Sequence, residues 1–209
     1  MIGIRPDGLK EVLGYAIAPT ESATIWEELM IDVKARGVEQ ILLFVAEGVV
    51  GLQSTIAKHF PKAQFQRCLV HVARNFTAKV RMAERKAIND DFRAVRQSPT
   101  REEAENAMEA FVEAWGATYP SIKKLGKLDN LFTYYGFPPA IRGSIYSTNL
   151  IESFNKTFKV NMRKKQQFPN EESLDRYVVT QCLNYNDGRI GHCHRGFASC
   201  CDTLESMFD

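Results

Sequence analysis

The sequence reads Ile-Leu-Leu-Phe-Val-Ala-Glu-Gly at residues 41–48, and this stretch decides the class of fold. Five apolar residues in a row, at 41–45, predict a strand buried on both faces, as in a sheet covered by helices. Helical patterns flank this strand on both sides. Thr20-Glu21-Ser22 opens an amphipathic helix that ends at Gly37, and a second helix is predicted from Gly51 to His59. Alternating strands and helices favour a three-layer α/β core.

The rest of the chain extends this core and interrupts it. Pro6-Asp7-Gly8 is a turn signal, which predicts a hairpin between residues 1–5 and a strand at 11–18. A short strand is expected around Phe65. From about residue 74 to 145 the pattern is helical and charge-rich without a strand signal, and its clearest helix begins at Pro99-Thr100. Further helices are predicted around Glu152 and from Glu171 to about Tyr185. We therefore predict a core in two pieces, 1–73 and 146–187, with a helical insertion at 74–145 and a tail at 188–209.

Composition limits the classes of protein that the chain can belong to. Its 209 residues suffice for one sizeable α/β domain, and 44% hydrophobic with 25% charged residues is ordinary for a globular protein. The formal net charge is only +2, so nucleic-acid binding would have to come from local basic patches. Five unevenly spaced cysteines and the absence of a secretory leader or long apolar run predict reduced thiols and a cytoplasmic protein without a membrane partner.

Two acidic residues occupy positions that suit a metal ion. Glu47 follows the predicted buried strand, and ligands in α/β sheets gather at the carboxyl ends of strands. The alternative is a solvated turn residue beside Gly48. Glu152 also has two readings, because Asn149-Leu150-Ile151-Glu152 matches a capping box, in which the acid reaches back to the backbone of the cap. The sequence leaves the cap and the metal ligand equally open.

Two groups of cysteine and histidine residues are candidates for a metal site or a catalytic site. Cys68 and His71 lie three positions apart, but zinc would need a second such pair, and nucleophilic catalysis would need an orienting partner that the sequence does not show. Packing, or support of a metal site, is the favoured role. In the tail, His192-Cys193-His194 and Cys200-Cys201 are spaced unlike any standard zinc site.

A basic stretch follows Glu152. Residues 153–168 carry no acid and five positive charges, at Lys156, Lys159, Arg163, Lys164 and Lys165. This pattern suits a track for DNA phosphates, although a solvated helix face would look the same. The next candidate for DNA binding is the basic patch at Arg67, Arg74, Lys79 and Arg81.

Three segments together resemble the Mutator-type transposases of bacterial insertion sequences. The first is residues 44–48 with Gly51-Leu52, similar to a strand that ends in Asp-Gly and continues to Gly-Leu in the family. The second is residues 60–63 and 66–71 with Arg74-Asn75, which looks like the family's Cys-x2-His signature. The third is residues 148–153 with Asn155, followed by Phe168-Pro169-Asn170. The resemblance runs over essentially the whole chain, in matching order and spacing.

This resemblance implies an RNase H-like core, N-terminally truncated here and interrupted by an α-helical insertion. A triad of two Asp and one Glu would hold two Mg²⁺ (or Mn²⁺) ions for DNA cleavage and strand transfer. The second acid carries over to Glu47 and the third to Glu152, while Lys159 would contact a phosphate near the transferred DNA end. Cys68, His71, Arg74 and Asn155 carry over as motif residues that support the core. The implied partners are transposon ends and target DNA, with a second copy or a full-length transposase.

The chain departs from the family pattern at two acids. The family's first Asp lies upstream of the hairpin, where this chain has no counterpart, and Asp7 is placed in the turn. Position 47 is Glu rather than Asp, which moves the carboxylate by about 1.5 Å against a metal spacing of about 3.5–4 Å. We therefore expect the C-terminal part of a transposase, a remnant or one half of a split reading frame, with little cleavage of its own. The alternatives are a non-catalytic DNA-binding or interaction module, and a cysteine-dependent hydrolase built on Cys68 and His71.

Overall fold

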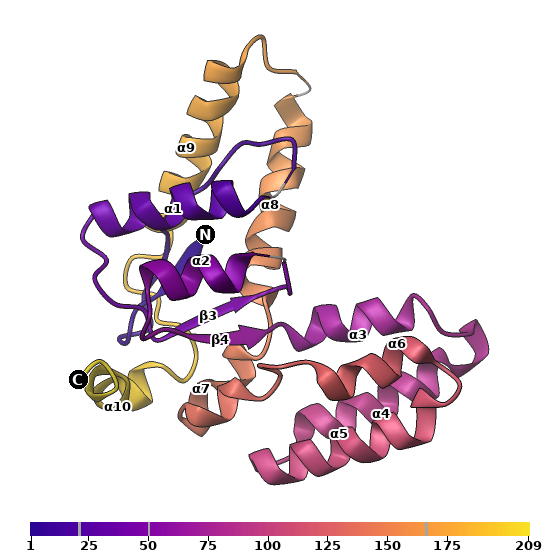
Figure 1. The fold of residues 1–209 in the computed structure, drawn as a ribbon. Coiled ribbons are helices and arrows are strands. Elements are labelled where there is room, and N and C mark those ends of the chain that lie inside the picture. The colour runs from indigo at the N-terminus through magenta and orange to yellow at the C-terminus, as the bar shows by residue number, and fades with distance from the viewer. Residues whose placement is uncertain (21, 50, 166) are drawn as a thin grey trace. The chain divides into compact units, whose positions relative to one another are not determined.

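The computed structural model describes residues 1–20, 22–49, 51–165 and 167–209 (Figure 1). The fold is mixed α/β and mostly helical. The chain forms two compact units, each considered by itself: unit 1 comprises Met1–Leu42, Val49–Ala63 and Asn149–Asp209, and unit 2 comprises Leu43–Gly48 and Gln64–Thr148. Within the described ranges, no helix combines the length and the apolar composition needed to cross a bilayer.

Unit 1 begins with the predicted hairpin. Strands β1 (Ile2–Ile4) and β2 (Lys10–Val12) pair antiparallel with Ile2 opposite Val12. The turn between them uses Gly8 at φ +86°, a conformation that favours glycine. The prediction of a strand over residues 11–18 was too long: β2 ends at Val12, and a further backbone hydrogen bond, from the Leu13 N–H to the Met1 carbonyl at 3.0 Å, follows it.

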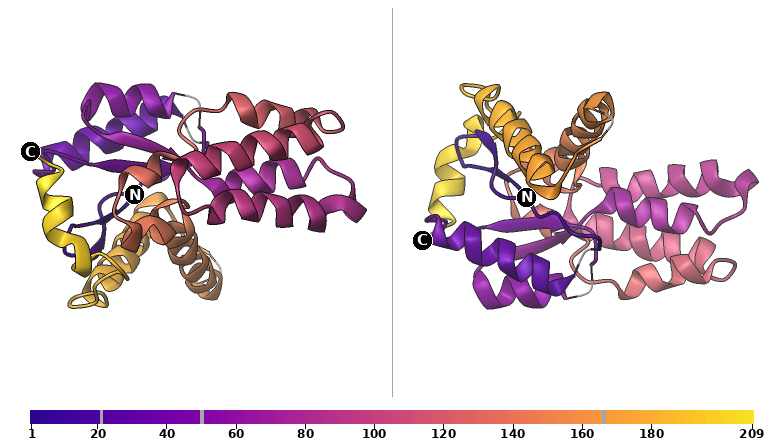
Figure 2. Two further views of the ribbon diagram at one scale, coloured as in Figure 1. Left: turned by 90° about the horizontal axis from the view of Figure 1, so that it is seen from below. Right: turned by 90° about the horizontal axis from the view of Figure 1, so that it is seen from above.

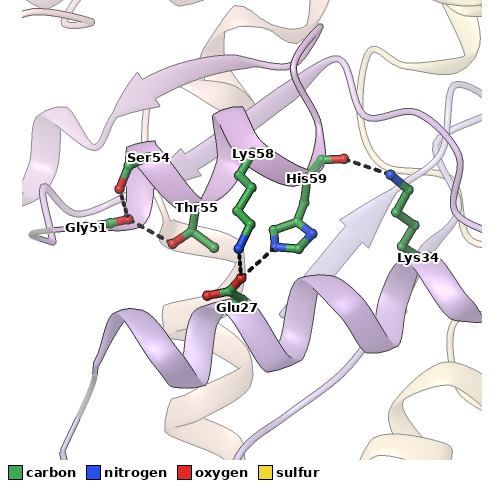
Figure 3. Close-up of polar contacts among 7 residues, drawn as sticks. All are labelled: Glu27, Lys34, Gly51, Ser54, Thr55, Lys58 and His59. Carbon is green, nitrogen blue, oxygen red and sulfur yellow. Dashed lines mark hydrogen bonds and ion pairs between the residues drawn. The ribbon is translucent and has the colours of Figure 1, made fainter.

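Two short helices of unit 1 are joined by polar contacts (Figure 3). Helix α1 (Ala23–Ala35) is capped by Ser22, whose Oγ accepts from the Ile25 N–H at 3.3 Å; Glu21 lies outside the described residues. Helix α2 (Leu52–His59) follows Gly51, as predicted. The Glu27 carboxylate of α1 accepts from Lys58 Nζ and lies 3.3 Å from His59 Nε2 of α2. Opposite charges thus tie the two helices together at their exposed edge.

The third part of unit 1 is a helical hairpin, formed by α8 (Asn149–Lys165) and α9 (Glu171–Asp187) (Figures 1 and 2). Its seam is aromatic: Phe154 packs edge-on against Tyr185 with ring centroids 5.0 Å apart, and Phe168 lies 5.2 Å from Tyr177. Helix α9 also contacts the first hairpin, since the Val12 N–H donates to Asn186 Oδ1 at 2.7 Å. The tail continues into η4 (Ala198–Cys200) and α10 (Cys201–Ser206).

Unit 2 holds the strand that the sequence placed at the centre of the fold. Strand β3 (Leu43–Ala46) pairs parallel with β4 (Gln64–Arg67), with Phe44 opposite Phe65. All four β3 residues are half-buried, so the prediction of a strand buried on both faces was wrong. The reason is that β3 and β4 form a sheet of two strands within the described residues, rather than an inner part of a wide parallel sheet. The run of apolar residues identified the strand but overstated its burial.

The remainder of unit 2 is helical, with a core of rings from three helices. Phe76, Phe92 and Phe111 lie with centroids 5.1–5.6 Å apart, and all three are buried. The elements are α3 (Leu69–Thr77), η1 (Met82–Glu84), α4 (Arg85–Gln97), α5 (Arg101–Gly116), α6 (Pro120–Lys123), η2 (Lys124–Lys127), η3 (Thr133–Gly136) and α7 (Pro139–Ile145). Helix α5 begins where Thr100 was predicted to start it, and the Thr100 side chain accepts from the Glu103 N–H. The proposed domain boundaries at 73, 145 and 187 stay a prediction.

Candidate functional site

Glu47 lies directly after β3 and is held by a histidine of α3. His71 Nε2 is 2.6 Å from Glu47 Oε1, which is a short hydrogen bond or ion pair. The histidine side chain is 18% exposed and that of Glu47 is 56% exposed, so the carboxylate keeps access to solvent on its other side. A carboxylate acceptor here requires a proton on Nε2, which leaves Nδ1 of a neutral ring as an acceptor.

The other face of the imidazole meets a buried thiol. Cys68 is the residue before α3, is 0% exposed, and has its Sγ 3.2 Å from His71 Nδ1. Thr148 closes the group, because its backbone N–H donates to Cys68 Sγ at 3.3 Å and its Oγ1 lies 3.3 Å from the same sulfur and 3.2 Å from Nδ1. Cys68, His71, Thr148 and Glu47 therefore form one hydrogen-bonded network, which we call the Cys68 network.

This network supplies the orienting partner that the sequence did not show for Cys68 and His71. A thiol, an imidazole and a carboxylate in series are the parts of a cysteine-hydrolase triad. The thiol is nevertheless fully buried, and reactive cysteines need partial exposure so that a substrate can reach them. The burial of Cys68 therefore argues against the cysteine-dependent hydrolase and agrees with packing, while support of a metal site stays a prediction.

A second contact fixes the end of β3. The Arg67 guanidinium lies across Gly48, and a Cβ at position 48 would overlap Arg67 Nη1. The backbone supports the same junction: the Cys68 N–H donates to the Ala46 carbonyl, and the Arg67 N–H donates to the Asn130 carbonyl, both at 2.8 Å. Glycine at position 48 thus leaves room for the half-buried Arg67 side chain at the end of β3.

Helix α8 in unit 1 carries the predicted basic residues on the side away from its aromatic seam. At about 100° per residue, Lys156, Lys159 and Arg163 fall within about 60° of one another around the axis. All three are exposed, and in the described part of the chain no carboxylate pairs with them. Lys164 is exposed on the flank of this face. Lys165 differs, because its ammonium lies 5.2 Å from the centroid of Tyr177 and 5.7 Å from that of Phe168.

Comparison with known proteins decides the family. The model of the family described as "Transposase, Mutator family" matches residues 1–188. The chain belongs to the Mutator family of transposases. The resemblance inferred from the three sequence segments is therefore confirmed.

Individual transposases are similar over most of this chain. It is 44% identical over 209 residues to the transposase for insertion sequence element IS905 of Lactococcus lactis subsp. lactis, covering 100% of this chain and 54% of that protein. It is 45% identical over 186 residues to the transposase for insertion sequence element IS1201 of Lactobacillus helveticus, covering 88% of this chain and 50% of the relative. The chain spans about half the length of the curated relatives it matches.

The next feature is the placement of the acidic side chains that the family resemblance assigns to Mg²⁺ or Mn²⁺. Among the described residues, no group of three or more His, Cys, Asp or Glu side chains is placed to hold an ion, in the tail or elsewhere. One oxygen of Glu47 already bonds His71. Mg²⁺ sites commonly take some of their ligands from substrate phosphates, so the binding of a divalent ion by Glu47 and Glu152 stays a prediction. The proximity of Glu47 and Glu152 stays a prediction.

Glu152 lies in the first turn of α8 and is half-buried. Asn149 is already helical, which makes Glu152 the fourth residue of α8. The two interpretations of Glu152, as the acid of a capping box and as a metal ligand, both stay predictions. Glu152 also falls in the same sector of the helix as Lys159, as the spacing of seven predicted. Of the other motif residues, Asn155 is exposed on α8 and the Arg74 guanidinium lies 3.5 Å from His71 Nε2.

Sequence reasoning missed two members of the site, Thr148 and Arg67. Thr148 is 80 positions from Cys68, and nothing in local pattern links a threonine to a distant thiol. Arg67 was noted within the second family segment and as part of a basic patch, without a role at the site. The available signal was its place directly after β4, at the same edge of the sheet as Glu47.

Proposed function

We propose that this chain acts in the transposition of an insertion element, and that α8 is the surface by which it holds DNA phosphates. The observation that supports this most directly is the exposed basic face of Lys156, Lys159 and Arg163, placed opposite an aromatic seam that fixes the helix. A rigid row of unpaired cations binds polyanions without first breaking internal ion pairs.

The finer parts of the proposal concern the core and its acids. In an RNase H-like core, β3 would end in the second acid and α8 would carry the third, which is the order in which Glu47 and Glu152 occur. Glu47 and Glu152 would then hold Mg²⁺ or Mn²⁺, and these ions would supply Lewis-acid stabilisation at the phosphodiester. Glu47 would be positioned for this by His71, and His71 by Cys68 and Thr148, the buried members of the Cys68 network.

The test is the salt dependence of DNA binding. In fluorescence anisotropy of a labelled duplex, three α8 cations that contact phosphates should contribute about −2.7 to the slope of log affinity against log salt, at about −0.9 per contact. The triple substitution Lys156→Ala, Lys159→Ala and Arg163→Ala should remove that contribution.

A matched control comes from three exposed lysines on other elements. The control replaces Lys123, Lys124 and Lys127 of α6 and η2 in unit 2 by alanine. This substitution removes three positive charges, as the α8 substitution does. The control triple should keep at least most of the slope. Equal losses in both variants would mean that binding follows net charge alone, and the proposal for α8 would be wrong.

A further inference from the structure

The turn between α3 and α4 presents a methionine to solvent. Met82, the first residue of η1, is 80% exposed, the largest exposed fraction of any large apolar side chain among the described residues. The turn follows the end of α3 that points away from β4 (Figure 1). Met82 is therefore accessible to a binding partner.

The backbone around Met82 is held firmly. Val80 is buried at 5% exposure and anchors the turn in the helical core. Thr77 Oγ1 donates to Asn89 Oδ1 at 3.1 Å, and Asn89 Nδ2 donates to the Arg85 carbonyl at 2.7 Å, so the ends of α3 and α4 are joined across the turn. The exposure of Met82 is therefore a property of an ordered turn with hydrogen bonds on both sides.

The surroundings of Met82 are strongly basic. Lys79, Arg81, Arg85 and Lys86 flank it within four residues in either direction. Glu84 is the one acid of this stretch in the sequence, and the Tyr119 hydroxyl donates to its carboxylate. Lys86 pairs with Asp90 at 3.2 Å, but its side chain is 92% exposed. The turn thus combines one projecting apolar side chain with an excess of positive charge.

We propose that Met82 is a wedge that enters duplex DNA between two base pairs, while the flanking cations hold the phosphates on either side. This inference rests on the proposed function, namely that the chain acts on DNA. Apolar wedges flanked by basic residues, methionine among them, unstack a base step and kink the duplex by about 20–90°. Methionine suits the task because its unbranched chain is slim and adaptable.

Exposure and charge together distinguish this turn from the other exposed apolar side chains. Val160 also has four cations within four residues, but it is 48% exposed in the middle of α8, whereas Met82 is 80% exposed in a turn. Ile190 is 76% exposed, but the preceding residues Asp187 and Arg189 cancel in charge. Cations on both sides of one methionine suit the two phosphate backbones that border a base step. The same reasoning predicts a preference for flexible steps such as TA, where unstacking costs least.

The test uses the full chain and a duplex with 2-aminopurine at a central TA step, and donor and acceptor dyes at its ends. Binding of the unaltered chain should brighten the 2-aminopurine and shorten the end-to-end distance. A mismatch at that step should strengthen binding by about tenfold, because the unstacking cost is already met. Met82→Ala should abolish the brightening and the distance change and bring the mismatch preference close to one, with an unchanged salt slope.

Two further variants, and a binding measurement with anionic vesicles, serve as controls. Ile190→Ala, the matched control, should leave every readout unchanged, whereas Lys79→Ala with Arg81→Ala should flatten the salt slope by about 1.8. Brightening that survives Met82→Ala overturns the wedge, and so does Met82-dependent binding to anionic vesicles with none to DNA. Binding without any kink refutes the wedge alone. A chain that binds no duplex at low salt refutes the proposed function as well.

Discussion

Replacing Cys68 by alanine tests whether the buried network holds unit 2 together. The change removes the sulfur that accepts from the Thr148 N–H at 3.3 Å, in a site where Cys68 is 0% and Thr148 9% exposed. A buried donor without a partner costs about 1–3 kcal/mol, and the small cavity left by the sulfur costs about 1 kcal/mol. The free energy of unfolding of unit 2 should therefore fall by about 2–4 kcal/mol.

The two tryptophans make this measurable for one unit at a time. Trp26 lies in α1 of unit 1 and Trp115 in α5 of unit 2, where its Nε1 donates to Asp91 at 2.8 Å. In a Trp26→Phe background, urea unfolding followed by fluorescence reports unit 2. Cys68→Ser keeps an acceptor and should cost less than Cys68→Ala, and Cys193→Ala, at an exposed thiol, should stay within about 0.5 kcal/mol of the parent.

A double-mutant cycle separates the network from simple packing. Thr148→Val removes the hydroxyl that contacts both Cys68 Sγ and His71 Nδ1 but keeps the shape of the side chain. If the network acts as a unit, the costs of Cys68→Ala and Thr148→Val should differ from additivity by at least about 0.5 kcal/mol. Additive losses, or a loss for Cys68→Ala no larger than that of Cys193→Ala, would refute the reasoning.

Three further outcomes follow from the structure. Lys165→Ala should lower the stability of unit 1 by about 0.5–1 kcal/mol in a Trp26-only protein, because it removes the contact with Tyr177, and should leave the DNA salt slope unchanged. Lys159→Ala should leave the stability unchanged and flatten the salt slope. Burial, and then the charge of Lys10, hold the pKa of His194 below its usual 6.5, so the folded form prefers the neutral ring. The contribution of His194 to the free energy of unfolding of unit 1 should therefore be fully present above pH 6.5 and fall as the pH drops below 6.5. In urea unfolding at several pH values, His194→Asn should remove this decrease at acid pH. Finally, the purified chain should show little or no DNA nicking with Mg²⁺ or Mn²⁺, since position 47 carries Glu where the family resemblance expects Asp; robust nicking that Glu152→Ala abolishes would contradict this.

Local chemistry made the helices predictable. Ser22, Thr100 and Asn170 each precede a helix and each accepts from a backbone N–H three residues on, so the residues that signal the start also stabilise it. The position of β3 and the basic stretch of α8 were equally readable, because both depend on consecutive or periodically spaced residues.

Contacts between distant segments were not predictable in this way. The Thr148 contacts with Cys68, and the amide of Gln66, which is 0% exposed and donates to the Leu131 carbonyl at 2.9 Å, depend on how loops return to the sheet. The same limit explains the burial of β3, since burial is set by neighbours that the strand's own sequence does not encode. Glu47 was correctly placed at the end of its strand, but its partner His71 could come only from the fold.

The contact between Glu47 and His71 has an evolutionary consequence. Aspartate at position 47 would shorten the side chain by about 1.5 Å, which turns the 2.6 Å contact into a separation beyond hydrogen-bonding range. Glu47→Asp would thus break the contact with His71. The family resemblance sets aspartate beside the same Cys-x2-His signature, so relatives with aspartate at this position are expected to bring the carboxylate to the histidine through a different course of the chain at the end of β3.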